Sequence, residues 1–185
     1  PSPATIQAET VTGSWHTINR TVADTPVTED VFRASLRHGA TPTSADYAYY
    51  VRPGTALSAE GTLPPFTQPK ILANTAELQA AATEAGTTAA FAFYSKGVCP
   101  APAVGKIRTD TPCLILLRQL EDGTIRLGVS NPENTPATAH VELSARLVGD
   151  DATWNAAAGA TVVTFALPDG LQAGATVIRD LRREN

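Results

Sequence analysis

Residues 31–54 read VFRASLRHGATPTSADYAYYVRPG, and this stretch decides the fold class. In its first part apolar and polar side chains alternate with a period of two, the spacing at which successive side chains of a β-strand point to opposite faces. One face carries Phe32, Ala34, Leu36 and His38, and the other carries Arg33, Ser35 and Arg37. A second alternating run places Tyr47, Tyr49 and Val51 on one face, and Ala48, Tyr50 and Arg52 on the other. Residues 39–46 between them are rich in Gly, Pro, Thr, Ser and Asp, so the stretch predicts two strands joined by a turn-rich loop.

The second half of the chain repeats this period between short turns. Residues 113–120 form a nearly continuous apolar run, and Asp122-Gly123 then marks a hairpin turn. Alternating runs at 125–130, 140–147 and 163–167 and a last strand at 175–181 follow. This pattern predicts an all-β protein, an antiparallel β-sandwich. Residues 74–85 leave two structures open, because Ala, Glu, Leu and Gln favour a helix there; we expect sheet, since tertiary context overrides propensity.

Composition restricts the classes of partner. The chain has 185 residues, 43% of them hydrophobic, and a net charge of -4 without a basic cluster. We therefore expect neither nucleic acid nor an anionic membrane surface as a partner. No apolar run approaches the ~18 residues of a membrane span. The chain contains no methionine and begins at Pro1, so we expect that its N-terminus arose by processing, by proteolysis or by design of the expressed chain.

The two cysteines, Cys99 and Cys113, leave two states open. They are either unpaired thiols in a β core or a disulfide, which would contribute roughly 3 kcal/mol by closing a loop of about 15 residues. They cannot form a zinc site, because no histidine stands at ligand spacing to them. The sequence also lacks the common nucleophile, phosphate-binding and metalloprotease motifs, so we expect no metal and no cofactor.

Two motifs resemble one known family. The pattern HG-x-x-P-x-x-A-x-Y-x-Y-x-x-x-PG is formed by His38, Gly39, Pro42, Ala45, Tyr47, Tyr49, Pro53 and Gly54, and an upstream pattern, G-x-W-x-x-IN, by Gly13, Trp15, Ile18 and Asn19. Both are similar to sheet motifs of polysaccharide lyase family eight, which includes hyaluronate, chondroitin AC and xanthan lyases. The resemblance implies that residues 1–98 are the C-terminal part of a central β-super-sandwich and that residues 99–185 are a smaller C-terminal β-sandwich domain. Three prolines within residues 98–112 are consistent with a boundary there.

The resemblance also implies where the chemistry lies. A lyase of this kind needs a base, a proton donor and groups that neutralise a carboxylate, and His38, Tyr47 and Asn19 are suitable residue types. However, the catalytic Asn, His, Tyr and Arg of the family lie on a helical domain N-terminal to the sandwich, so we expect no catalytic residue in this chain. A structural role is expected for the motif residues Trp15, Asn19, His38, Gly39, Tyr47, Tyr49, Pro53 and Gly54. We expect Trp15 as a core or inter-sheet aromatic, and the alternative is a platform on which a sugar stacks. We expect Tyr47 in a core and His38 bonded to loop backbone.

The leading hypothesis is a C-terminal β-sandwich fragment or processed chain of a secreted bacterial polysaccharide lyase. The parent enzyme would cleave an acidic polysaccharide, hyaluronan or chondroitin, by β-elimination. Its partner would be the helical catalytic domain or chain of the same lyase, and this part would form or support one wall of the substrate cleft. Three outward cations, Arg33, Arg37 and Arg52, are candidates for substrate contact. The alternative is an autonomous sandwich that binds carbohydrate or acts as a spacer, without catalysis.

Overall fold

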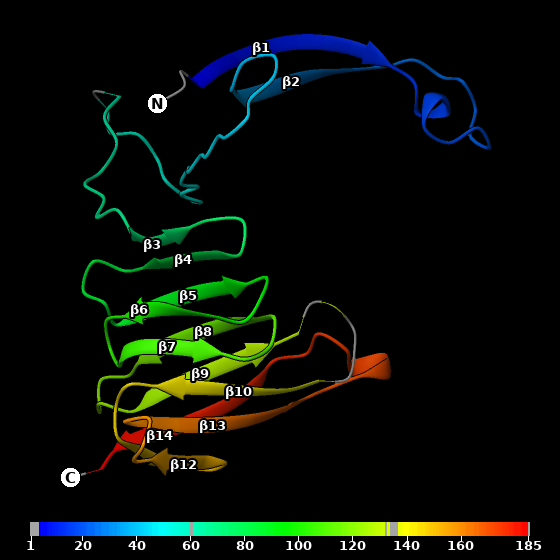
Figure 1. The fold of residues 1–185 in the computed structure, drawn as a ribbon. Coiled ribbons are helices and arrows are strands. Elements are labelled where there is room, and N and C mark those ends of the chain that lie inside the picture. Colours follow the sequence, from blue (N-terminus) through cyan, green and yellow to red (C-terminus); the bar gives the residue numbers. More distant parts are fainter. Residues whose placement is uncertain (1–3, 60, 132, 134–136, 185) are drawn as a thin grey trace. The chain divides into compact units, whose positions relative to one another are not determined.

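A computed structural model describes residues 4–59, 61–131, 133 and 137–184. The chain divides into two units, Pro1–Gly54 and Thr55–Asn185, and nearly all regular structure in both is β (Figure 1). All strand pairs are antiparallel, which confirms the predicted fold class. The only helices among these residues are two three-residue 3-10 turns, and neither has the length and hydropathy that crossing a bilayer requires.

The first unit is built on a two-stranded ribbon. β1 (Ala4–Gly13) pairs with β2 (Val27–Leu36) over ten residues, from Ala4 opposite Leu36 to Gly13 opposite Val27. The connection contains the 3-10 turn Trp15–Thr17, and the Ser14 hydroxyl caps it by accepting the His16 backbone N–H at 3.2 Å. The register gives the ribbon one face on which Ala8 lies opposite Phe32, and a second face on which Gln7 lies opposite Arg33. The predicted alternation of β2 is therefore confirmed.

The second strand predicted in this stretch does not form. Residues 37–54 contain no strand, and β2 pairs with β1 instead. The ten-residue register with β1 offers β2 more ladder hydrogen bonds than the short run 47–52 could. Pro42 and Pro53, which lack the N–H that a ladder needs, stand on either side of that run.

The second unit is a sandwich of two antiparallel sheets. The seven-stranded sheet contains, in spatial order, β11 (Leu147–Gly149), β14 (Val177–Arg183), β9 (Ile125–Ser130), β8 (Cys113–Gln119), β5 (Thr88–Phe93), β4 (Leu78–Ala82) and β3 (Lys70–Asn74). The five-stranded sheet contains β12 (Ala152–Asn155), β13 (Ala160–Leu167), β10 (Ala137–Leu143), β7 (Gly105–Thr109) and β6 (Gly97–Ala101). Residues 74–85 thus contain a strand, β4, as expected.

The core of this unit lies between the two sheets. Inward side chains alternate with outward ones along each strand, and fully buried examples are Leu117 and Leu127 from the larger sheet and Leu143 and Phe165 from the smaller one. The Asp-Gly turn forms as predicted. There the Thr124 backbone N–H donates to the Asp122 carboxylate at 2.9 Å, and Gly123 has a φ of 82°. Alternation and turn chemistry therefore determine the strands of this half.

The two compact units do not meet at residues 98 and 99, where the family resemblance implies a domain boundary. That position lies inside β6, and the division falls between Gly54 and Thr55. Pro100 belongs to β6, which is an edge strand, and a proline is tolerated at an edge because no neighbour needs its N–H. Pro112 stands between β7 and β8. These prolines therefore mark an edge and a connection within one sandwich.

Candidate functional site

The segment after β2 brings three aromatic side chains of the motif together. The ring centroids of His38 and Tyr47 are 6.0 Å apart and tilted by 39°, while Tyr47 and Tyr49 stack at 6.3 Å with 9° between their planes. The glycines at the ends of this segment, Gly39 and Gly54, have φ values of 88° and 66°, a left-handed conformation that disfavours other residues. The motif glycines therefore shape the chain that carries the cluster.

The exposure of these rings differs from the expectation. Tyr47 is 61% exposed and Tyr49 69% exposed, whereas we expected Tyr47 in a core. Trp15 is 65% exposed in its 3-10 turn, and it too was expected in a core. Period-two alternation indicates that a side chain faces one side of a strand, but it does not specify what covers that side. In this unit the two strands of the ribbon supply no second layer for these rings.

Asn19 and His16 take part in local backbone structure. The Asn19 carboxamide oxygen accepts the Thr21 backbone N–H at 3.0 Å and the Thr21 hydroxyl at 2.8 Å, which is an Asx turn. His16 Nδ1 lies 2.7 Å from the Val22 carbonyl oxygen. These contacts hold the connection between β1 and β2.

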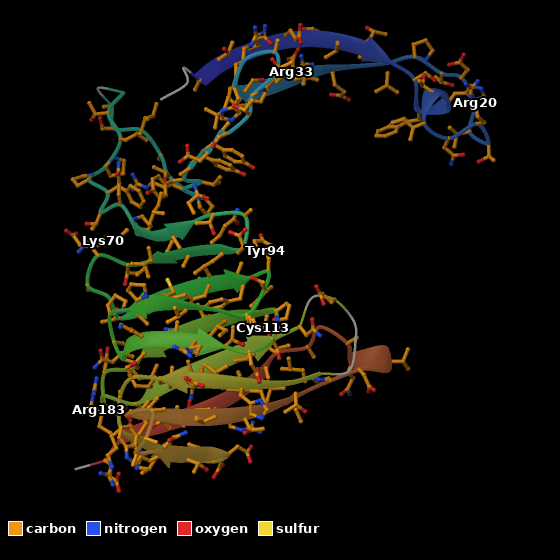
Figure 2. All side chains as sticks on the ribbon, in the orientation of Figure 1. Arg20, Arg33, Lys70, Tyr94, Cys113 and Arg183 are labelled. Atoms are coloured by element: carbon orange, nitrogen blue, oxygen red, sulfur yellow. The ribbon has the colours of Figure 1, made fainter. Side chains whose placement is uncertain are left out.

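The three candidate arginines lie on different segments. Arg33 is on β2 (Figure 2). Its guanidinium is 3.8 Å from the Glu9 carboxylate on β1. Both side chains are about half exposed, so this pair contributes little, on the order of 0–1 kcal/mol. Arg37 is exposed directly after β2, and Arg52 is half-buried near the end of the segment. Arg33 could exchange its carboxylate partner for one on a ligand at small cost.

A hollow along the ribbon has the wrong charge for a polyanion. It is lined by Ala8, Glu9, Thr10, Asp30, Val31 and Phe32. The Thr10 hydroxyl donates to the Asp30 carboxylate at 2.6 Å, so this carboxylate is held in place. Two carboxylates in one hollow repel an acidic chain, and the hollow is therefore no candidate for such a substrate.

The second unit contains a polar pair, Asp110 and His140, that no sequence motif indicates. Asp110, just after β7, receives the His140 backbone N–H at 3.0 Å on one oxygen and lies 2.7 Å from His140 Nδ1 through the other. Partial burial raises the pKa of Asp110, but the hydrogen bonds from His140 and Thr111 outweigh burial and hold this pKa below its usual value. The two residues are 30 positions apart, and only the alternation that faces His140 outward could have suggested the pair.

The cysteines are free thiols buried on different sheets, Cys99 on β6 and Cys113 on β8. Of the two states left open by the sequence, the structure has the unpaired one. Burial raises the pKa of both thiols. The Cys113 thiol donates to the Thr109 hydroxyl at 3.5 Å, so it is engaged in the core. Neither thiol is an accessible nucleophile. In the part of the chain that the structure describes, no group of three or more His, Cys, Asp or Glu could hold a metal ion.

Comparisons with known proteins match both parts of the chain to one family. Residues 1–62 match the super-sandwich domain of polysaccharide lyase family 8, and residues 70–140 match the C-terminal β-sandwich domain of that family. Chondroitinase-AC from Pedobacter heparinus is 36% identical over 108 residues, which is 58% of this chain and 15% of that protein. A hyaluronate lyase from Thermasporomyces composti is 28% identical over the whole chain and 22% of its own length.

Solved structures of related enzymes have the same fold. The structure of a chondroitinase AC lyase with oligosaccharide superposes with a TM-score of 0.69 and 29% identity over 96% of this chain and 25% of that one. The chondroitin AC lyase of Streptomyces coelicolor A3 superposes with a TM-score of 0.70 at 22% identity, over 98% of this chain and 24% of that one, a likeness of fold alone.

The matched domains are those of lyases that act on polysaccharides. The chain belongs to polysaccharide lyase family 8, and it carries matches to the super-sandwich and C-terminal β-sandwich domains of that family in this order. It spans between 15% and 25% of the length of the relatives named above.

Proposed function

We propose that this chain is the structural β-sandwich part of an exported bacterial lyase that cleaves hyaluronan or chondroitin by β-elimination. The observation that carries the proposal is the order of the two family matches, residues 1–62 followed by residues 70–140. Relatives named chondroitinase-AC and hyaluronate lyase support the substrate class. The two family domains would meet within residues 63–69, which lie in a strand-free connection before β3.

The catalytic groups would lie on another domain of the same lyase. β-Elimination requires a base and a proton donor positioned at the substrate, in a site that restricts water. Among the motif residues, His38 and Tyr47 have suitable chemistry and their rings are in contact, but Tyr47 and its neighbour Tyr49 are largely exposed. The chain would instead form or support one wall of the substrate cleft.

We assign substrate contact within this part to Arg33, Arg37 and Arg52. A guanidinium can bind a uronate carboxylate through two parallel hydrogen bonds. The exposed positions of Arg33 and Arg37 and the weak ion pair of Arg33 support this role. In the longer lyase, Arg37→Ala would raise KM severalfold with a smaller effect on kcat, and Arg108→Ala, an exposed arginine on the five-stranded sheet, would serve as a matched control.

The proposal is tested by incubating the pure 185-residue chain with hyaluronan and, separately, with chondroitin. The ultraviolet absorbance of the unsaturated product should not rise with this chain alone. It should rise with a longer lyase chain that contains these residues and a helical domain. Product from the pure chain would make His38 and Tyr47 catalytic candidates again. Tight binding of either polysaccharide by the pure chain would favour an autonomous carbohydrate-binding sandwich.

A further inference from the structure

The outer face of the seven-stranded sheet carries a continuous apolar row. The registers of neighbouring strands align one outward residue from each of six strands: Ile71, Ala81, Ala90, Leu116, Gly128 and Ile178. In the next row Ala92 lies opposite Leu114. We call Ile71, Ala81, Ala90, Ala92, Leu114, Leu116 and Ile178 the apolar strip. Leu114 and Leu116 are 42% and 46% exposed, although a solvated sheet face normally alternates to polar residues.

The outer face of the five-stranded sheet has a different character. There Glu142 lies opposite Arg108 across the ladder, with 3.6 Å between their charged groups, and Asp110 holds His140. Cross-strand ion pairs are typical of a face that contacts water. Both outer faces thus carry a cross-strand ion pair, which on the larger sheet is Arg126–Asp180. They differ because, among the described residues, an uncharged row that crosses most strands of a sheet lies on the larger one.

The leucines and alanines of the strip alternate as ridges and troughs. On β8, Leu114 and Leu116 project from the sheet, while on β5 the residues beside them are Ala92 and Ala90. On the other side of Leu116 lies Gly128, where the Thr176 methyl group lies 3.1 Å from the position a Cβ would take. A ridge of large side chains beside a shallow row of alanines is a shape into which the side chains of a second layer can interdigitate.

The size of the strip indicates what kind of partner it suits. Six strands span about 24 Å, and two rows of side chains are about 14 Å deep, so the strip covers on the order of 340 Å². An interface of this size buries about 700 Å² over both partners, which is less than independent partners normally need. It is within the range of interfaces between domains of one chain. A covalent link supplies the effective concentration that a small interface lacks.

We propose that the apolar strip is a docking surface for another domain of the same, longer lyase chain, and that this domain presents apolar side chains to the strip and a carboxylate to Arg118. This inference rests on the proposed function. Arg118 is exposed on β8, on the same face as Leu116 and opposite Arg126. Arg126 already binds the Asp180 carboxylate through two hydrogen bonds of 2.7 and 2.6 Å, and no described carboxylate forms an ion pair with Arg118. The relatives are at least four times as long as the region that this chain matches, so a lyase of their length contains further domains that could dock on the strip.

The test measures how fast a thiol reagent labels Leu116→Cys. The control is Val98→Cys, an outward residue of β6 on the other sheet, because Val98 is 50% exposed and Leu116 46% exposed. Both are made in the 185-residue chain and in the longer lyase chain, and maleimide labelling is followed by mass spectrometry. The native thiols Cys99 and Cys113 are buried and provide the background rate.

In the 185-residue chain both variants should be labelled at similar rates. In the longer chain Leu116→Cys should be labelled at least about tenfold more slowly, because labelling then requires the domains to separate, while Val98→Cys should not change. Adding Arg118→Glu should restore much of the lost rate. Equal rates for Leu116→Cys in the two chains would overturn the proposal. Protection already present in the 185-residue chain and rising with its concentration would overturn it in favour of a second copy. Lyase activity is measured separately, so loss of the proposed function and loss of the docking surface are distinguished.

Discussion

Replacing Thr161 by valine should destabilise the second unit, because it removes a buried hydroxyl that bonds two backbone groups. Thr161 is fully buried on β13. Its hydroxyl donates to the Ala145 carbonyl at 2.8 Å and accepts the Leu147 backbone N–H at 2.9 Å. Residues 144–146 carry the chain from β10 in the five-stranded sheet to β11 in the seven-stranded sheet. One side chain therefore satisfies both backbone groups at the crossing.

The magnitude follows from the groups that Thr161→Val would leave unpaired. A buried backbone donor or acceptor without a partner costs about 1–3 kcal/mol, and two such groups are affected. The added methyl group recovers roughly 0.8 kcal/mol. We expect a net loss of about 1–5 kcal/mol in the free energy of unfolding, which lowers Tm by roughly 2–20 °C for a chain of this length. Thr161→Ser is the matched control, because it keeps the hydroxyl and should lose only about 1 kcal/mol.

Urea denaturation followed by the fluorescence of Trp154 measures this difference. Trp154 lies directly opposite Thr161 in the β12–β13 pair, and the other tryptophan, Trp15, belongs to the first unit. A Trp15→Phe background leaves Trp154 as the single reporter. If Thr161→Val unfolds at the same urea concentration as Thr161→Ser, or a higher one, the two hydrogen bonds do not carry the stability assigned to them.

Three further predictions concern close contacts and charge. Gly149→Ala should lower the free energy of unfolding by about 1–3 kcal/mol, because its Cβ would lie 2.6 Å from the Asp180 backbone oxygen. Gly13→Ala is the control and should be neutral, since a Cβ there would meet nothing within 4 Å. Equal urea midpoints for the two variants would contradict this prediction. Asp151 has a φ of 57° and binds the Arg179 guanidinium at 2.9 and 2.7 Å. Asp151→Asn should therefore lose about 1 kcal/mol less in the free energy of unfolding than Asp151→Ala, since asparagine tolerates this left-handed backbone conformation better than alanine. Equal losses for the two variants in urea denaturation would count against this prediction. Because the pKa of Asp110 is lower in the folded chain, its carboxylate stabilises the fold above the unfolded value of about 3.9 and loses this effect as pH falls further. Between about pH 6 and pH 3, the urea midpoint of Asp110→Asn should then fall less than that of the unmodified chain. If the two midpoints fall by the same amount, the Asp110 carboxylate does not stabilise the fold as stated.

The strands of the second unit could be predicted from sequence, because each has its own alternation and its own turns. Asp122-Gly123 is an example: the turn and both flanking strands, β8 and β9, lie within one short window. The burial of Ile125, Leu127 and Val129 follows from the same window. Local chemistry determines these features, so a local pattern predicts them.

The features that could not be predicted depend on distant residues. The run 47–52 alternates like a strand, but a strand needs a neighbour with free ladder groups, and β2 takes β1 as its partner. Pro100 reads as a break, although an edge position makes it harmless. Asp110 and His140 meet only because β7 and β10 are neighbours, and nothing within either segment specifies this pairing. In each case sheet topology determined the outcome.

Sheet topology also restricts where an acidic polysaccharide could be attracted. In the second unit, Arg108, Arg126, Arg146 and Arg179 each pair with a carboxylate of a neighbouring strand or turn. Their charges are therefore compensated at short range, and at distances beyond about 10 Å salt screens what remains. With a net charge of -4, the chain as a whole repels a polyanion. Under the proposed function, attraction of such a substrate would have to come from cations of other domains, and Arg33 and Arg37 would act only at contact distance. That is the property expected of a cleft wall that positions a chain already bound elsewhere.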